Sequence, residues 1–154
     1  MQSAPRRIEV SVARQRLRLL EGEEEIASFP VSTSKFGLGT EEGSNHTPLG
    51  RFVIERKIGE GAEPGAVFKS REVVGQWKPG EVVDEDLVLS RILWLHGLEP
   101  ENANTRQRYI YIHGTNEEEK IGQTASHGCV RMRNADVVSL YDMVDEETEV
   151  LIIA

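Results

Sequence analysis

The sequence predicts a mostly β protein: a sandwich or a barrel-like pair of sheets with one clear helix, at about residues 135–144. Three observations lead to this fold class. Apolar residues alternate with polar ones in short segments, glycine-bearing turns separate the segments, and only one stretch carries apolar residues at helical spacing. The length of 154 residues suits one domain, expected over residues 1–154, because single domains commonly contain about 100–150 residues.

Three strands are expected at the start of the chain, joined as an antiparallel meander. Apolar side chains alternate with polar ones in residues 8–12 and 16–19, and a Glu21-Gly22 turn leads to a third apolar segment at residues 26–31. Short strands joined by short turns favour antiparallel pairing. Residues 32–48 are polar and glycine-bearing, so we expect a long loop there.

Strands and loops are expected to alternate up to the helix. Apolar and β-branched residues predict further strands at 51–56, 67–74, 82–83, 92–95, 109–112 and 150–153, with the weaker patterns at 67–74 and 82–83. The helix is expected to begin at Asn134, because asparagine is a favoured N-cap residue. Apolar residues follow it at helical spacing, at Val137, Val138, Tyr141 and Val144.

Charge and composition narrow the classes of partner. The formal net charge is −8, which argues against a nucleic-acid partner, since such proteins present positive charge to phosphates. No apolar run approaches the roughly 18 residues of a membrane-spanning helix, so no membrane segment is expected. The N-terminus lacks a secretory signal pattern, so the chain as written is expected to be cytoplasmic. The periplasm or the cell envelope is the alternative if a leader has been removed.

Cys129 is the only cysteine, and it lies in the run Ser126-His127-Gly128-Cys129-Val130-Arg131. A thiol attacks as the thiolate, and a free cysteine has a pKa near ~8.5, so a nearby imidazole is the usual means of activating it. The adjacent glycine permits a tight turn. In that turn the N–H groups of His127, Gly128 and Cys129 would converge as an oxyanion hole for a tetrahedral intermediate.

His113 is the expected general base for this thiol. It lies sixteen residues upstream, at the end of a predicted strand where Gly114 begins a turn, so its imidazole would project at a sheet edge. A catalytic imidazole needs a third group to orient its ring, and no Asp or Asn lies at an obvious spacing. The carbonyl of Gly114 is the simplest candidate for that group.

Other interpretations of these residues stay open at this point. Cys129 could be a small buried apolar residue. His113, His127 and Cys129 could bind zinc, although they lack the paired spacing of structural zinc sites, so we expect no metal and no cofactor. His127 could be a hydrogen-bonded structural histidine as readily as a substrate contact.

Three further residues have no assigned role. His96 repeats the His-Gly dipeptide of His113 but follows a predicted buried strand, so we expect a structural histidine with satisfied hydrogen bonds. His46 lies in a polar loop and is expected to be exposed. Trp77, beside Lys78-Pro79-Gly80, is a candidate for a mobile flap over the site.

The His113-Gly114-Thr115 stretch and the 126–131 run together resemble the signature of the L,D-transpeptidase (YkuD-type) catalytic domain. Val31-Ser32-Thr33-Ser34 and the segment Thr47-Pro48-Leu49-Gly50-Arg51-Phe52 are similar to the family's sequence before its active site. Matching segments extend over about residues 8–153. The resemblance implies a mostly β fold and an acyl-enzyme mechanism.

The resemblance also implies roles for single residues. Cys129 would be the nucleophile and His113 its base, with the Gly114 carbonyl as orienter. Substrate contacts would come from Ser126, His127 and Arg131.

The activity that the resemblance implies is that of an L,D-transpeptidase, a transferase of cell wall biogenesis and cell shape. It would cleave the L,D bond before the terminal D-Ala of a peptidoglycan stem peptide and pass the acyl group to an amine, giving a 3→3 crosslink or a protein anchor. Carbapenem-type β-lactams would be covalent inhibitors. Two alternatives stay open: transfer to water, as a cytosolic L,D-carboxypeptidase (a hydrolase) in peptidoglycan recycling, and a non-catalytic domain that binds wall peptides.

Overall fold

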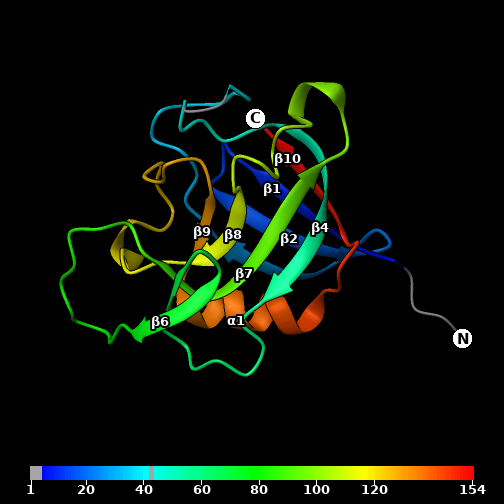
Figure 1. Ribbon diagram of the computed structural model, residues 1–154. Coiled ribbons are helices and arrows are strands. Elements are labelled where there is room, and N and C mark those ends of the chain that lie inside the picture. The colour runs from blue at the N-terminus through cyan, green and yellow to red at the C-terminus, as the bar shows by residue number, and fades with distance from the viewer. Residues whose placement is uncertain (1–4, 42–43) are drawn as a thin grey trace, which may run out of the picture.

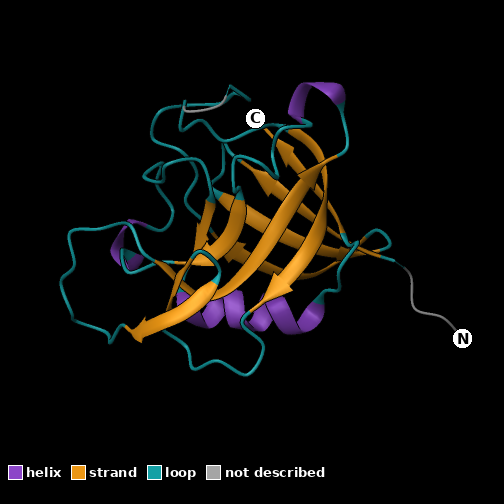
Figure 2. Ribbon diagram, viewed as in Figure 1, coloured by secondary structure: helices purple, strands orange, loops and turns teal. Residues whose placement is uncertain are grey.

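The computed structural model describes residues 5–41 and 44–154, which form one curved, mixed sheet with an α-helix packed on it (Figures 1 and 2). The fold class predicted from the sequence, mostly β with one clear helix, is confirmed. The strands are β1 (Arg6–Ser11), β2 (Arg16–Glu21), β3 (Glu24–Pro30), β4 (Gly50–Ile58), β5 (Ala66–Lys69), β6 (Glu72–Gln76), β7 (Val88–Gly97), β8 (Tyr111–Gly114), β9 (Val130–Met132) and β10 (Glu149–Ile153). The helix α1 covers Asn134–Met143, and short 3-10 turns occupy Pro100–Asn102 and Glu118–Lys120.

The expected meander is present as β1, β2 and β3, which pair antiparallel in that order. Ile8 lies opposite Leu19 and Val10 opposite Leu17. All four side chains are fully buried. The strict alternation of the sequence therefore sorts the side chains of β1 and β2 onto an inner and an outer face.

The sheet continues through β10, which pairs parallel with β1 and antiparallel with β4. β7 follows β4 and is the strand at which the sheet branches, because it pairs with β4, β5 and β8. A bulge between Leu89 and Ile92 marks the branch, and Ser90 within it has a φ of 72°. The bulge bends the strand, so that β8 and its parallel neighbour β9 curl over the rest of the sheet (Figure 1).

The helix α1 lies across one end of the curved sheet and packs against β7 and β8 (Figure 2). Val137, Leu140 and Tyr141 are its buried apolar residues, and they join the core formed by the inner faces of the strands. The helix thereby supports β8, the strand that carries His113, from below. No helix in the described residues is long and apolar enough to cross a membrane.

Several predicted boundaries are wrong. Residues 67–74 form a hairpin of two strands, because Ser70 and Arg71 adopt the positive φ values (49° and 67°) that tight hairpin turns favour. Residues 82–83 lie in a loop and form no strand. The segment predicted at 109–112 begins two residues later, at Tyr111, because Tyr109 has a φ of 56° that interrupts extended backbone.

The predicted N-cap is also wrong, since the cap position is Arg133 and Asn134 is already helical. The Asn134 side chain is buried and contacts other elements instead. Its Oδ1 accepts a hydrogen bond from the Ser90 hydroxyl (2.5 Å), and its Nδ2 donates to the Thr115 carbonyl (2.9 Å). Asn134 therefore ties the helix to β7 and to the residue that follows β8.

Candidate active site

The ladder between β8 and β9 brings the two motifs of the sequence side by side. The two strands are parallel, and His113 lies opposite Arg131. Cys129 directly precedes β9, and its Sγ accepts a hydrogen bond from the Tyr111 N–H at 3.3 Å. Residues sixteen apart in the chain thus become neighbours across one ladder, and alternate residues of each strand share a face.

The turn before β9 is held by its own serine. Ser126 is fully buried; its hydroxyl donates to the Cys129 carbonyl (2.7 Å) and accepts from the Gly128 N–H (3.3 Å). Gly128 has a φ of 122°, a conformation that favours glycine, and a Cβ there would lie 3.3 Å from the His46 carbonyl oxygen. The serine and the glycine of the run are therefore both required by the shape of this turn.

The loop around His46 closes over the turn from outside. The Thr47 hydroxyl donates to the Gly128 carbonyl at 3.0 Å, and the His46 carbonyl accepts from Arg108 at 2.7 Å. His46 is half-buried, so the expectation that it is exposed is wrong. Its backbone, packed against Gly128, explains the burial.

Cys129 is partly buried beside an apolar cluster that consists of Ala66, Phe68, Ile92, Trp94 and Tyr111. Its thiol donates to the Tyr109 carbonyl at 3.5 Å. Burial raises the pKa of the Cys129 thiol to about 11, and the charge of Asp86 adds to the rise, against the opposing effects of the Tyr111 N–H, Arg131 and Arg108. Cys129 is therefore a neutral thiol at pH 7 in the substrate-free site.

His113 is only 2% exposed, and its Nδ1 lies 2.5 Å from the Gly114 carbonyl oxygen. Because a carbonyl only accepts, the proton resides on Nδ1 and Nε2 is left as a proton acceptor. Burial lowers the pKa of His113, the nearby Arg131 lowers it further, and Asp86 and the Gly114 carbonyl act in the opposite direction. The imidazole is thus neutral at pH 7, with its orientation fixed by the adjacent residue.

Close packing explains the glycine after His113. A Cβ at Gly114 would overlap the Asn134 side-chain oxygen and the Leu89 carbonyl. The backbone of β8 therefore reaches both the helix and β7 only because residue 114 has no side chain. The carbonyl that contacts the His113 ring is held in place by that packing.

Arg131 is the most buried charge of the site, with no exposed surface. Its Nη2 pairs with Asp86 (2.6 Å) and with Glu117 (2.9 Å). Its Nε and Nη1 have no hydrogen-bond partner among the described residues. The other oxygen of Asp86 lies 3.0 Å from Nδ1 of His127, whose side chain is 43% exposed and contacts the Phe36 ring.

Asp86 and Glu117 were not predicted from the sequence. Both are acidic residues among 26 in the chain, and both lie in irregular segments where no periodic pattern singles out a position. No signal in the sequence singles out either residue.

Two residues that lacked a role lie in unexpected surroundings. His96 lies in β7 opposite Val53, and its buried Nδ1 has no hydrogen-bond partner among the described residues. The expectation that the hydrogen bonds of His96 are satisfied is therefore wrong. The apolar neighbour across the ladder offers no acceptor. Trp77 is 6% exposed, and its Nε1 donates to the Glu81 carbonyl (3.0 Å). It is therefore a buried anchor at the base of the loop that leads to β7, and not a mobile flap.

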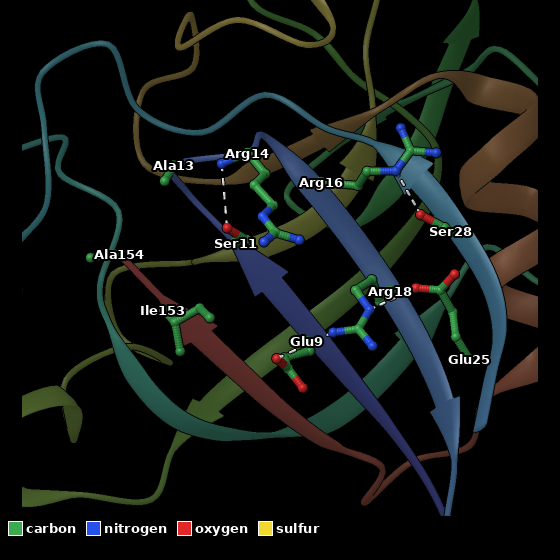
Figure 3. Close-up of a pocket in the computed structure, with 10 residues that line it drawn as sticks. All are labelled: Glu9, Ser11, Ala13, Arg14, Arg16, Arg18, Glu25, Ser28, Ile153 and Ala154. Carbon is green, nitrogen blue, oxygen red and sulfur yellow. Dashed lines mark hydrogen bonds and ion pairs between the residues drawn. The ribbon is translucent and has the colours of Figure 1, made fainter. Parts of the chain in front are cut away.

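A hollow of about 790 Å³ lies elsewhere, on the outer face of β1 and β2 near the end of β10 (Figure 3). Arginine side chains project into it, but Arg16 donates to the Ser28 hydroxyl (2.7 Å) and Arg18 pairs with Glu25 (2.6 Å). It contains none of the residues of the two motifs. Across the part of the chain that the structure describes, no group of three or more His, Cys, Asp or Glu side chains is arranged to hold a metal ion.

Comparison with known proteins identifies the family. The family model described as "L,D-transpeptidase catalytic domain" matches residues 5–152. The putative L,D-transpeptidase YkuD of Bacillus licheniformis is 30% identical over 148 residues, which is 96% of this chain and 66% of that protein. The chain thus spans slightly less than two thirds of this relative.

Solved structures show the same fold. An L,D-transpeptidase from Xylanimonas cellulosilytica superposes with a TM-score of 0.64 at 20% identity, over 99% of this chain and 62% of that one. The L,D-transpeptidase LdtMt1, solved in complex with imipenem, gives 0.61 at 17% identity, over 98% and 59%. The family that the two motifs suggested is confirmed: the chain belongs to the L,D-transpeptidase catalytic domain family.

Proposed function

We propose that this domain is a cysteine acyltransferase that acts on peptidoglycan stem peptides. Cys129 attacks the carbonyl of the L,D bond before a terminal D-Ala, holds the acyl group as a thioester and passes it to an amine. One observation carries the proposal: Cys129 directly precedes β9 and is hydrogen-bonded to Tyr111 of β8, the parallel strand that carries His113, and the His113 Nδ1 is engaged by Gly114. A pair arranged in this way suits general-base activation of a nucleophile.

The pKa directions support a particular order for the first step. Because the thiol and the imidazole are both neutral at rest, no thiolate–imidazolium pair is formed in advance. Nε2 of His113 takes the thiol proton as the sulfur attacks, and the carbonyl oxygen gains the negative charge. The Gly128 N–H already donates to Ser126, so we propose the N–H groups of His127 and Cys129 as the main oxyanion donors.

The later steps reuse the same imidazole. When the tetrahedral intermediate collapses, the carbon–nitrogen bond breaks and His113 gives its proton to the leaving amine of D-Ala. The acceptor amine then attacks the thioester and loses a proton to His113, and that proton returns to the departing sulfur. Every proton taken is given back, so the cycle needs no cofactor.

We propose supporting roles for the other motif residues on the basis of their burial and contacts. Ser126 is fully buried and bonded within the turn, so we propose that it shapes the turn instead of contacting substrate directly. His127 is the exposed side chain of the run, which supports its proposed role as a substrate contact. Arg131 supplies fixed positive charge beside the nucleophile, where negative charge develops.

A β-lactam tests the chemistry. Imipenem is bound by the relative LdtMt1, and its strained amide carbonyl can acylate a thiol. Intact-mass measurement after incubation should show one adduct on the wild-type protein and none on Cys129→Ala. An unmodified wild-type mass would contradict the proposal and favour the domain that only binds wall peptides.

A second measurement identifies the acceptor. A tetrapeptide stem is supplied with and without an amine acceptor, and the products are separated by mass. Cross-linked product that requires the amine supports transpeptidation. Free tripeptide as the only product, with the amine present, would show that water is the acceptor and that the enzyme is an L,D-carboxypeptidase.

A further inference from the structure

The loop between β6 and β7 carries Asp86, whose carboxylate contacts side chains on both sides of Cys129 in the sequence. His127 and Arg131 lie two residues before and two residues after Cys129. Asp86 contacts both, with Oδ2 3.0 Å from His127 Nδ1 and Oδ1 2.6 Å from Arg131 Nη2. Its side chain is 27% exposed, so this bridge is not an open surface ion pair.

The loop that carries Asp86 is fixed to the strand that carries His113. Asn116, two residues after Gly114, accepts a hydrogen bond from the Leu87 N–H (3.0 Å). Its Nδ2 donates to the carbonyls of Glu85 (3.0 Å) and Val83 (3.3 Å). One amide side chain thus holds the backbone on both sides of Asp86, which sets the position of the carboxylate relative to the site.

The guanidinium of Arg131 depends on that carboxylate. It has no exposed surface, and its ion pairs are with Asp86 and Glu117 alone among the described residues. A buried cation that loses a partner moves or attracts water, because an uncompensated buried charge is costly. Glu117 contacts the same nitrogen but does not reach His127. Asp86 is therefore the residue that links the guanidinium to the imidazole.

We propose that Asp86 is a positioning residue for the acylation of Cys129, holding His127 and Arg131 in place on either side of the sulfur. It acts through these two side chains and does not contact the reacting atoms. The acylation part of this inference rests on the proposed function. Its electrostatic part does not, because the charge of Asp86 acts on the thiol of the substrate-free protein.

Asp86→Asn should change two reactivities in opposite directions. The charges that face Cys129 are Asp86 from the loop, Arg131 from β9 and Arg108 from the segment before β8, with the His113 imidazole on β8. Loss of the Asp86 charge lowers the pKa of Cys129, so alkylation by the small neutral reagent iodoacetamide should become faster at pH 8. Acylation by imipenem should slow roughly 10-fold to 100-fold, because His127 and Arg131 are no longer held.

Matched variants separate positioning from charge balance. Glu117→Gln removes the other carboxylate on Arg131 but leaves Asp86 in contact with His127. This variant should therefore slow acylation much less than Asp86→Asn. Asp84→Asn lies in the same loop and touches neither motif residue, so both rates should match wild type. Equal losses in Glu117→Gln and Asp86→Asn would overturn the proposal, as would acylation of Asp86→Asn at the wild-type rate.

If thermal unfolding measurements show that Asp86→Asn is not folded, Asp86→Glu provides a second test. It retains the charge but displaces the carboxylate, so alkylation should stay near the wild-type rate while acylation falls. Wild-type acylation in Asp86→Glu would overturn the positioning role. If imipenem fails to acylate even the wild-type protein, the proposed function is wrong. An unchanged alkylation rate in Asp86→Asn would separately show that the Asp86 charge does not act on the Cys129 thiol.

Discussion

His113 and Arg131 lie opposite each other across the parallel ladder of β8 and β9, so an imidazole and a guanidinium leave the same face of the sheet. Both side chains are buried. Burial and the neighbouring cation both lower the pKa of His113. Under the proposed function, a proton taken from the thiol would therefore be held weakly. A weakly held proton is readily given to a leaving amine, which suits a base that must also act as an acid.

Replacing His113 tests the base. His113→Ala should acylate with imipenem about 10²–10⁴-fold more slowly, because general-base catalysis contributes that range. The rate is measured by intact mass over time, and thermal unfolding checks that the variant is folded. Acylation at the wild-type rate would show that the base is misassigned, and His127 would become the candidate.

The pH dependence of Cys129 alkylation tests the neutral resting thiol. With a pKa of about 11, the thiolate fraction should still be rising at pH 10, so iodoacetamide should react faster with each step up to that pH. An unperturbed thiol would level off above its ordinary pKa of ~8.5. The chain has one cysteine, so mass spectrometry reads this single site directly. A plateau near pH 9 would contradict the neutral thiol.

Protein stability should depend on pH through His113. Its pKa is lower in the folded protein than in the unfolded chain, so the unfolded state binds more protons as the pH falls. The stability contributed by the buried neutral imidazole is therefore complete above the unfolded pKa of ~6.5 and is lost progressively below it. Urea unfolding at pH 8 and pH 5 should show that the free energy of unfolding falls more between these pH values for the wild type than for His113→Gln. Equal losses would show that His113 does not control this dependence.

Gly114→Ala tests the packing that fixes the orienting carbonyl. The added methyl overlaps the Asn134 side chain and the Leu89 carbonyl, so the variant should unfold at a lower urea concentration, with a cost of about 1–3 kcal/mol as for other overpacked sites. Asn134→Ala removes one of the two overlapping groups. Gly114→Ala should therefore cost less free energy of unfolding in the Asn134→Ala background than in the wild type. A fully additive double variant would show that Asn134 is not the obstacle.

The fold could be predicted where a strand is half-buried and its sequence alternates, as from Ile8 to Leu19. The two motifs around His113 and Cys129 could be predicted because their residue types carry chemistry at any position. The hairpin within residues 67–74 could not, since Ser70 and Arg71 are not typical of a tight turn.

Long-range contacts explain the other failures. Asparagine is a residue type that N-cap positions favour, but the Asn134 side chain is hydrogen-bonded to Ser90 and Thr115 instead. Neither residue is near Asn134 in the chain. Asp86 is one acidic residue in an irregular loop, and Asn116 holds that loop where Asp86 contacts His127 and Arg131. Contacts between distant segments, set by tertiary packing, decided both cases.

The neutral state of Cys129 has a consequence for durability. Peroxide oxidises sulfur through the thiolate, so a thiol with a pKa of about 11 reacts slowly with it. The chain's single sulfhydryl should therefore form sulfenic acid slowly in the substrate-free protein. Under the proposed function, the sulfur would become reactive only once a bound peptide brings its carbonyl to it.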